Sequence, residues 1–169
     1  ASDVYKRQTV ENALAAAALA RAAGVEPVAV RDGLRSYEPG AHRIQPVATT
    51  HGVLWVNDSK ATNPHAADAS LASFSPVIWI AGGLSKGVAY DELVEKHADR
   101  LKGVVLIGTD TESLLQALDR HAPHVPVLRA AEGISAPVED GRAVMAQAVR
   151  LGHDLAAVSY THLRAHETG

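Results

Sequence analysis

The chain has 169 residues, of which 47% are hydrophobic and 21% are charged, a balance typical of a globular protein with a core and not of a disordered chain. A formal net charge of -3 supplies no basic surface for nucleic acid, and the absence of Cys excludes disulfides and thiolate chemistry. No apolar run approaches the roughly 18 residues of a membrane span, and no segment has the order of a secretory signal. We therefore expect a soluble, cytoplasmic protein that binds neither nucleic acid nor a membrane.

The two ends of the chain, residues 1–8 and 159–169, do not share the pattern of the residues between them. Both resemble translated sequencing-adapter read-through, so we expect a non-native leader and a non-native tail on a fragment of a longer protein. The Ala-rich stretch Thr9–Ala23 predicts a helix closed by Gly24. A second helix is expected over residues 27–36, where Pro27 suits the first helical position.

From residue 43 onward, extended and helical segments alternate. A tight turn at His51-Gly52 joins extended segments at 43–50 and 53–56, because His is one of the few residues besides Gly that tolerate a positive φ. Further on we expect helices at 63–74, 90–101, 111–121 and 138–151, and strands at 76–81, 104–107, 125–128 and 155–158. Strands separated by helices of this length favour right-handed crossovers. The predicted fold is α/β: a Rossmann-like, mostly parallel sheet with one antiparallel strand and helices on both faces.

The segment 57–64, which reads NDSKATNP, carries the most polar chemistry of the chain and lies between a predicted strand and a predicted helix. Asn63-Pro64 can cap that helix, leaving backbone N–H groups that attract anions, and Lys60 adds a positive charge nearby. Asp58 could accept hydrogen bonds from ribose hydroxyls, and Thr62 could donate one to a carboxylate or a phosphate. The alternative is that these polar side chains only form turns ahead of a capped helix.

The string Asn-Asp-Ser-Lys-Ala-Thr-Asn at 57–63 closely resembles a motif in the C-terminal domain of the Mur ligases of peptidoglycan synthesis, in those members that add D-glutamate. Three further segments match the family in the same order: VENALAAAALARAAGV, PGAHRIQPV and the Gly-Gly…Lys loop IAGGLSKGVAYDEL. The resemblance runs from Thr9 to about Val158. It implies that residues 9–37 are a helical remnant of the central, ATP-binding domain, and that residues 38–158 are a truncated C-terminal Mur ligase domain.

The resemblance also implies an activity: part of a ligase that uses ATP and Mg²⁺ to convert the carboxylate of UDP-N-acetylmuramoyl-L-alanine to an acyl phosphate, which the amine of D-glutamate then attacks. By resemblance, two residues hold the side-chain carboxylate of D-glutamate, Thr62 and Lys86, and four contact ATP, namely Asn12, Arg43, Asp58 and Lys60. The phosphate-cradling loop Gly-x-x-x-x-Gly-Lys-Ser/Thr is absent from the sequence. The resemblance implies that this loop and the metal ligands belong to the family's central domain, so we expect no catalytic residue and no metal ligand here. We also expect a monomer, and a chain that lacks ligase activity by itself.

Two alternatives stay open. The chain could be the C-terminal domain of another Mur ligase or of a folylpolyglutamate synthase, although those relatives carry different strings at 57–63. It could also be a non-catalytic Rossmann-like binding module, which would lose no function when Lys60 or Lys86 is neutralised. His42 and His65 lie beside loops and are interpreted as partners in local hydrogen bonds, not as catalytic bases. Gly108-Thr109-Asp110 is interpreted as a turn.

Overall fold

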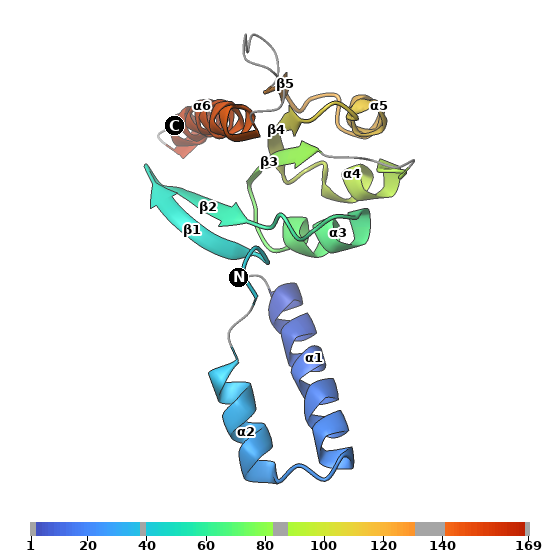
Figure 1. Ribbon diagram of the computed structural model, residues 1–169. Helices are drawn as coiled ribbons and strands as arrows, with labels where there is room; N and C mark the ends of the chain where they lie inside the picture. Colours follow the sequence, from blue (N-terminus) through green and yellow to red (C-terminus); the bar gives the residue numbers. More distant parts are fainter. Residues whose placement is uncertain (1–2, 38–39, 83–87, 131–140, 168–169) are drawn as a thin grey trace.

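The computed structural model describes residues 3–37, 40–82, 88–130 and 141–167, and Figure 1 shows how its elements are arranged. The elements in chain order are α1 (Asp3–Ala22), α2 (Pro27–Ser36), β1 (Gln45–Thr50), β2 (Val53–Asn57), α3 (Pro64–Ala72), β3 (Val77–Gly82), α4 (Asp91–His97), β4 (Leu101–Ile107), α5 (Glu112–His121), β5 (Val127–Arg129) and α6 (Gly141–Glu167). The α/β class is confirmed.

The first two helices form an antiparallel hairpin that extends away from the sheets, at the bottom of Figure 1. As predicted, the first helix ends at a glycine in the left-handed region, Gly24 with φ +84°, and Pro27 occupies the first turn of α2. The helix α1 begins at Asp3, six residues earlier than the expected Thr9, so residues 3–8 continue the helical backbone. Several apolar side chains of the hairpin are exposed, among them Leu14, Leu19 and Val28.

The strands form two sheets, whereas the sequence predicted one. β1 and β2 pair antiparallel through the predicted turn, in which His51 has φ 52° and Gly52 has φ 80°. The register shifts between Pro46 and Ala48, because a proline has no N–H to donate to the ladder. β3, β4 and β5 form a separate parallel sheet in that order, and none of the described strand pairs joins β2 to β3. The hairpin is therefore a two-stranded sheet of its own and not one antiparallel strand of a larger sheet.

Helices cover both faces of the parallel sheet, as predicted. Side chains alternate along β4, so that Val104 and Leu106 pack in one cluster with residues of α3, α4 and α5, while Val105 packs in a second cluster with Ala148 of α6. Figure 1 shows α6 on the opposite side of the sheet from the other three helices. This two-sided burial explains why β4 is an almost continuous apolar run.

The predicted strand at 155–158 is wrong, because α6 continues as one helix through these residues to Glu167. Val144, Leu151 and Leu155 follow a helical spacing, and all three pack against the sheet with the buried Ala148. Leu155 also fills the space beside Gly103, where an added Cβ would lie 2.8 Å from the Leu155 Cδ1 atom. The apolar stripe of the helix therefore includes Leu155, which the sequence had assigned to a strand.

Candidate functional site

The motif loop, residues 57–63, leaves the carboxyl end of β2 and leads into α3. Asn63 caps this helix as predicted: its Oδ1 accepts a hydrogen bond from the backbone N–H of Ala66 at 2.9 Å, and Pro64 occupies the first turn. The capping bond satisfies one of the free N–H groups at the start of α3. The polar side chains of the motif loop directly precede this helix. The motif loop is thus anchored at the helix by its last residue.

Short-range hydrogen bonds fold the motif loop into successive turns. The amide of Ser59 donates to Asn57 Oδ1 at 3.1 Å, that of Ala61 to the carbonyl of Asp58 at 2.8 Å, and that of Thr62 to the carbonyl of Lys60 at 2.9 Å. The interpretation of these residues as turn formers is therefore correct for the backbone. Lys60 and Thr62 are exposed on these turns.

A second segment, residues 42–45, is tied to the motif loop by two hydrogen bonds that backbone amides donate. The amide of Ile44 donates to Asp58 Oδ1 at 2.9 Å, and the amide of Lys60 donates to the carbonyl of His42 at 3.2 Å. His42 and Ile44 have φ values of 67° and 43°, which are uncommon for non-glycine residues and most costly for a β-branched one. Backbone strain of this kind persists only where the surroundings hold it, and it is concentrated at functional sites.

These bonds bring four of the six predicted ligand contacts together: Arg43, Asp58, Lys60 and Thr62. The carboxylate of Asp58 is half-buried and already accepts one hydrogen bond, and it retains acceptor capacity because a carboxylate has about four lone-pair sites. Asn12 is exposed on α1, which touches α3, and the hydrogen bonds that assemble the site do not include it. Lys86 lies outside the described residues.

Two acid–base clusters missed by the sequence reasoning hold the helices beside the loop together. Asp68 of α3 accepts hydrogen bonds from Lys96 Nζ at 2.8 Å and from His97 Nε2 at 2.7 Å, both at the end of α4. Partial burial raises the pKa of Asp68, but the hydrogen bonds and charges of Lys96 and His97 outweigh it, so the pKa lies below its ordinary value of 3.8. A pair of residues 29 positions apart leaves no local sequence signal.

The second cluster repeats the arrangement one helix further along. Asp91 at the start of α4 accepts a hydrogen bond from His121 Nε2 at 2.9 Å and another from Arg120, both at the end of α5. The hydrogen bond from His121 and the charge of Arg120 lower the pKa of Asp91 in spite of some desolvation. In each cluster, a basic residue and the His that follows it, at the C-terminal end of one helix, bind an Asp of the preceding helix. A positive charge at the C-terminal end of a helix also interacts favourably with the helix dipole.

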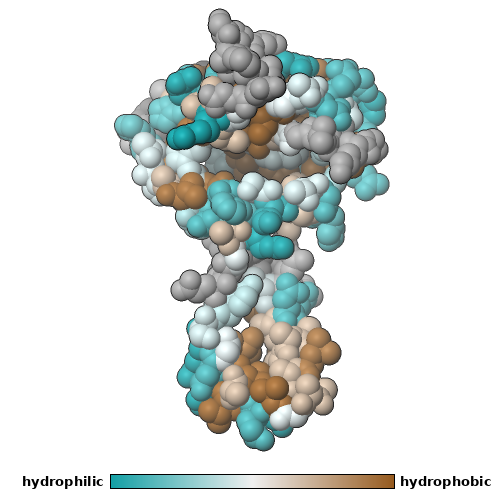
Figure 2. Space-filling model, in the orientation of Figure 1, coloured by the Kyte–Doolittle hydropathy of each residue, from teal (hydrophilic) through white to brown (hydrophobic). Residues whose placement is uncertain are grey.

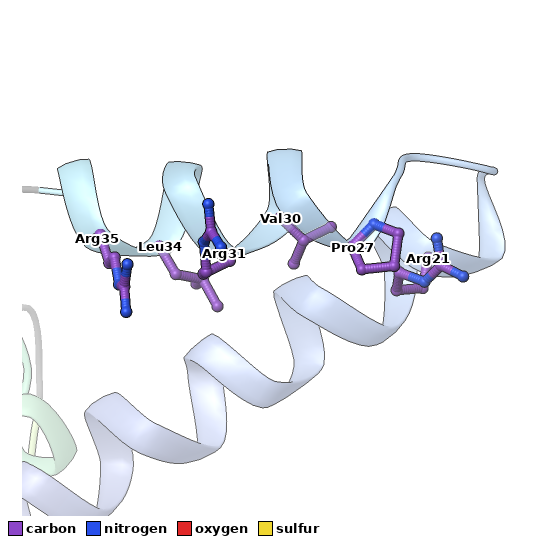
Figure 3. Close-up of a pocket in the computed structure, with 6 residues that line it drawn as sticks. All are labelled: Arg21, Pro27, Val30, Arg31, Leu34 and Arg35. Carbon is purple, nitrogen blue, oxygen red and sulfur yellow. The ribbon is translucent and has the colours of Figure 1, made fainter.

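A groove of about 490 Å³ lies between α1 and α2. Figure 3 shows Val30 and Leu34 pointing from α2 toward α1, with Arg31 and Arg35 along its margin. Figure 2 shows the same helical hairpin with apolar residues at its surface. All residues that line this groove belong to the hairpin or its connection, so the groove is separate from the motif loop.

Among the described residues, no group of three or more His, Cys, Asp or Glu side chains could hold a metal ion. Asp58, the acidic residue of the motif loop, accepts a hydrogen bond from the amide of Ile44. In the same part of the chain, no helix is both long and apolar enough to cross a bilayer.

Comparison with known families decides what the motif loop belongs to. The family described as "Mur ligase, glutamate ligase domain" matches residues 42–155, a range that contains the motif loop, the segment 42–45 and the parallel sheet. The chain belongs to this Mur ligase family. The resemblance expected from the string at 57–63 is thereby confirmed, and so is the expectation that this region is a Mur ligase C-terminal domain.

Among individual proteins, this Mur ligase domain is similar to the UDP-N-acetylmuramoylalanine–D-glutamate ligase of Streptomyces avermitilis, with 62% identity over 119 residues, which are 70% of this chain and 26% of that ligase. The ligase of the same name from Thermobifida fusca is 58% identical over 151 residues, covering 86% of this chain and 32% of the relative. That from Nocardia farcinica is 47% identical over 163 residues, covering 92% and 34%. The chain thus spans about a quarter to a third of the length of these relatives.

Proposed function

We propose that this chain is the part of a UDP-N-acetylmuramoylalanine–D-glutamate ligase that holds D-glutamate and one side of ATP during amide formation in peptidoglycan synthesis. The observation that carries the proposal is the pairing of the motif loop with the segment 42–45, which gathers Arg43, Lys60 and Thr62 at the carboxyl end of β2. The relatives are D-glutamate ligases by name, which favours this acceptor over that of another Mur ligase or a folylpolyglutamate synthase.

The proposed roles follow from the chemistry of the side chains. Arg43 offers a planar fork of donors that suits phosphate oxygens, and Lys60 offers a point charge, so both stabilise the polyphosphate of ATP. Asp58 accepts a hydrogen bond from a ribose hydroxyl while it keeps the amide of Ile44. Thr62 donates its hydroxyl to the side-chain carboxylate of D-glutamate, whose negative charge Lys86 balances. Asn12 contacts the adenine from α1.

In this proposal the domain contributes position, not covalent chemistry. It holds the D-glutamate amine against the acyl phosphate of UDP-N-acetylmuramoyl-L-alanine; the C–N bond forms, inorganic phosphate leaves and the amine loses a proton. The Mg²⁺ ligands and the phosphate-cradling loop belong to the central, ATP-binding domain of the ligase. Residues 9–37 of this chain are a helical remnant of that domain. We further propose that the ligase is a monomer and works in the cytoplasm, where ATP is available, and that this chain has no ligase activity by itself.

The test is a two-dimensional amide NMR spectrum of the chain, titrated separately with ADP, D-glutamate and L-glutamate. We expect ADP to shift the amides of the segment 42–45 and of Lys60, and D-glutamate to shift that of Thr62 at concentrations where L-glutamate has no effect. If a dispersed spectrum ignored both ADP and D-glutamate at millimolar concentration, the proposed half-site would be wrong. If L-glutamate shifted Thr62 as strongly as D-glutamate, the acceptor would be wrong.

A further inference from the structure

His42, which is not one of the proposed ligand contacts, lies where the segment 42–45 meets the motif loop. The Nδ1 atom of His42 lies 2.8 Å from the Nδ2 atom of Asn57, the residue with which the motif loop begins. His42 also uses its whole backbone: its amide donates to Gln45 Oε1 at 3.0 Å, and its carbonyl accepts from the amide of Lys60 at 3.2 Å. Three separate hydrogen bonds therefore meet at one exposed residue.

The hydrogen bonds determine which nitrogen of His42 carries the proton. The amide N–H of Ser59 can only donate, so the Asn57 atom that it contacts at 3.1 Å is the oxygen, Oδ1. The Asn57 atom that faces His42 is therefore the NH₂ group, which can only donate. The imidazole must accept at Nδ1, which requires a neutral ring with its hydrogen on Nε2.

The positions of the neighbouring residues show what this bond holds. Arg43 lies between His42 and Ile44, and each of these two is bonded to the motif loop, through the amide of Lys60 and through Asp58 Oδ1. Both also have positive φ values, so the turn that carries Arg43 is strained and needs external support. The bond between the His42 ring and Asn57 adds a third tie across the same junction.

From this geometry we infer that His42, as the neutral Nε2–H tautomer, is a positioning residue that latches the segment 42–45 to the motif loop and so keeps Arg43 beside Lys60. His42 does not touch the ligand in this scheme and transfers no proton. The value of the latch for catalysis rests on the proposed function, since it is ATP that Arg43 and Lys60 are proposed to bind. The existence of the latch does not rest on it.

A matched pair of variants isolates the ring of His42. His42→Gly removes the imidazole without strain because glycine adopts a positive φ freely, and His51→Gly does the same at the other end of the β1–β2 hairpin, where φ is 52°. A third variant, Asn57→Asp, keeps the oxygen that accepts from Ser59 but replaces the NH₂ donor with an acceptor. In this variant the atom that faces the His42 ring accepts a hydrogen bond, so the ring must donate one from Nδ1.

The first experiment is ¹⁵N NMR of the histidine rings in the chain, with the His42 signals identified by their loss in His42→Gly. We expect an unprotonated Nδ1 in the wild type and a protonated Nδ1 in Asn57→Asp. Backbone ¹⁵N relaxation of the Arg43 and Lys60 amides is expected to show greater ps–ns motion in His42→Gly and no change in His51→Gly. A wild-type ring protonated on Nδ1, or equal relaxation in the two glycine variants, would overturn the inference.

The second experiment separates the latch from the proposed function. In the complete ligase that contains this chain, His42→Gly should raise the KM for ATP about fivefold, the factor that one hydrogen bond of ordinary strength contributes, with a smaller change in kcat. His51→Gly should change neither constant. If the NMR results are as expected but the KM for ATP stays the same, the latch is supported and the proposed contact of Arg43 and Lys60 with ATP is refuted.

Discussion

The carboxyl end of β3 allows a sharp prediction, because Gly82 is packed against the backbone of β4. Gly82 pairs with Ile107 and has φ +153°, a conformation that side chains rarely adopt. An added Cβ would lie 1.8 Å from the carbonyl oxygen of Ile107 and 2.8 Å from its carbonyl carbon. We predict that Gly82→Ala forces the two strands apart at the point where β3 leaves the sheet.

The magnitude follows from two contributions. A non-glycine residue in this φ region costs about 1–3 kcal/mol. Relieving the overlap with a backbone atom, which cannot rotate away as a side chain can, costs about another 1–3 kcal/mol. The sum of about 2–6 kcal/mol is a large part of the 5–15 kcal/mol by which a domain of this kind is stable.

The assay is urea unfolding of the chain followed by circular dichroism, with Gly152→Ala as the control. Gly152 lies inside α6, where an added Cβ would make ordinary contacts of 3.6–3.8 Å with Ile80, Trp55 and Ile78. Alanine is the better helix former, so the control should gain about 0.5–1 kcal/mol. A Gly82→Ala chain that is as stable as the wild type would refute the close approach of β3 and β4 at this residue.

Three further predictions concern other parts of the fold. Asn63→Ala should lower the free energy of unfolding by about 1 kcal/mol through loss of the cap on Ala66, and an unchanged value would mean that the cap is not formed. Gly33→Ala in α2 should raise it by about 0.5–1 kcal/mol, because nothing lies within 4 Å of the added Cβ; a loss of stability would contradict the helix there. Because the pKa of Asp68 is lowered by folding, its carboxylate stabilises the fold above the unfolded pKa, and this contribution is lost as the pH falls through the folded value. Urea midpoints measured between about pH 5 and pH 3 should therefore fall less in Asp68→Asn than in the wild type, and equal slopes would show that the cluster does not contribute.

Local chemistry made part of the fold predictable. Asn63-Pro64 at the start of α3, Gly24 after α1 and His51-Gly52 in the hairpin each have a conformational preference that a few neighbouring residues decide. The end of α6 was not predictable in this way: Leu155 belongs to its stripe because of the space beside Gly103, some fifty positions earlier in the sequence. The separation of the hairpin from the parallel sheet likewise depends on strand pairing, which periodicity does not determine.

The candidate site shows the same division. The motif loop could be found from its sequence, and the family match confirmed what it belongs to. The attachment of the motif loop to the segment 42–45 could not be predicted from the sequence, because His42 and Asn57 are 15 positions apart and no sequence pattern pairs them. The amide of His42 makes a local hydrogen bond to Gln45, but the bond of its ring to the motif loop became visible only in the fold.

We propose that the hydroxyl of Thr62, an exposed residue of the motif loop, recognises D-glutamate. The most direct measurement is the KM for D-glutamate of the complete ligase with Thr62→Val, which removes the hydroxyl at nearly constant volume, with Thr109→Val as the control at another exposed position after a strand. A hydrogen bond to a charged carboxylate contributes about 1.5–3 kcal/mol, so the KM should rise at least about tenfold in Thr62→Val while the KM for ATP stays the same. The control should match the wild type. An unchanged KM for D-glutamate in Thr62→Val would contradict the account.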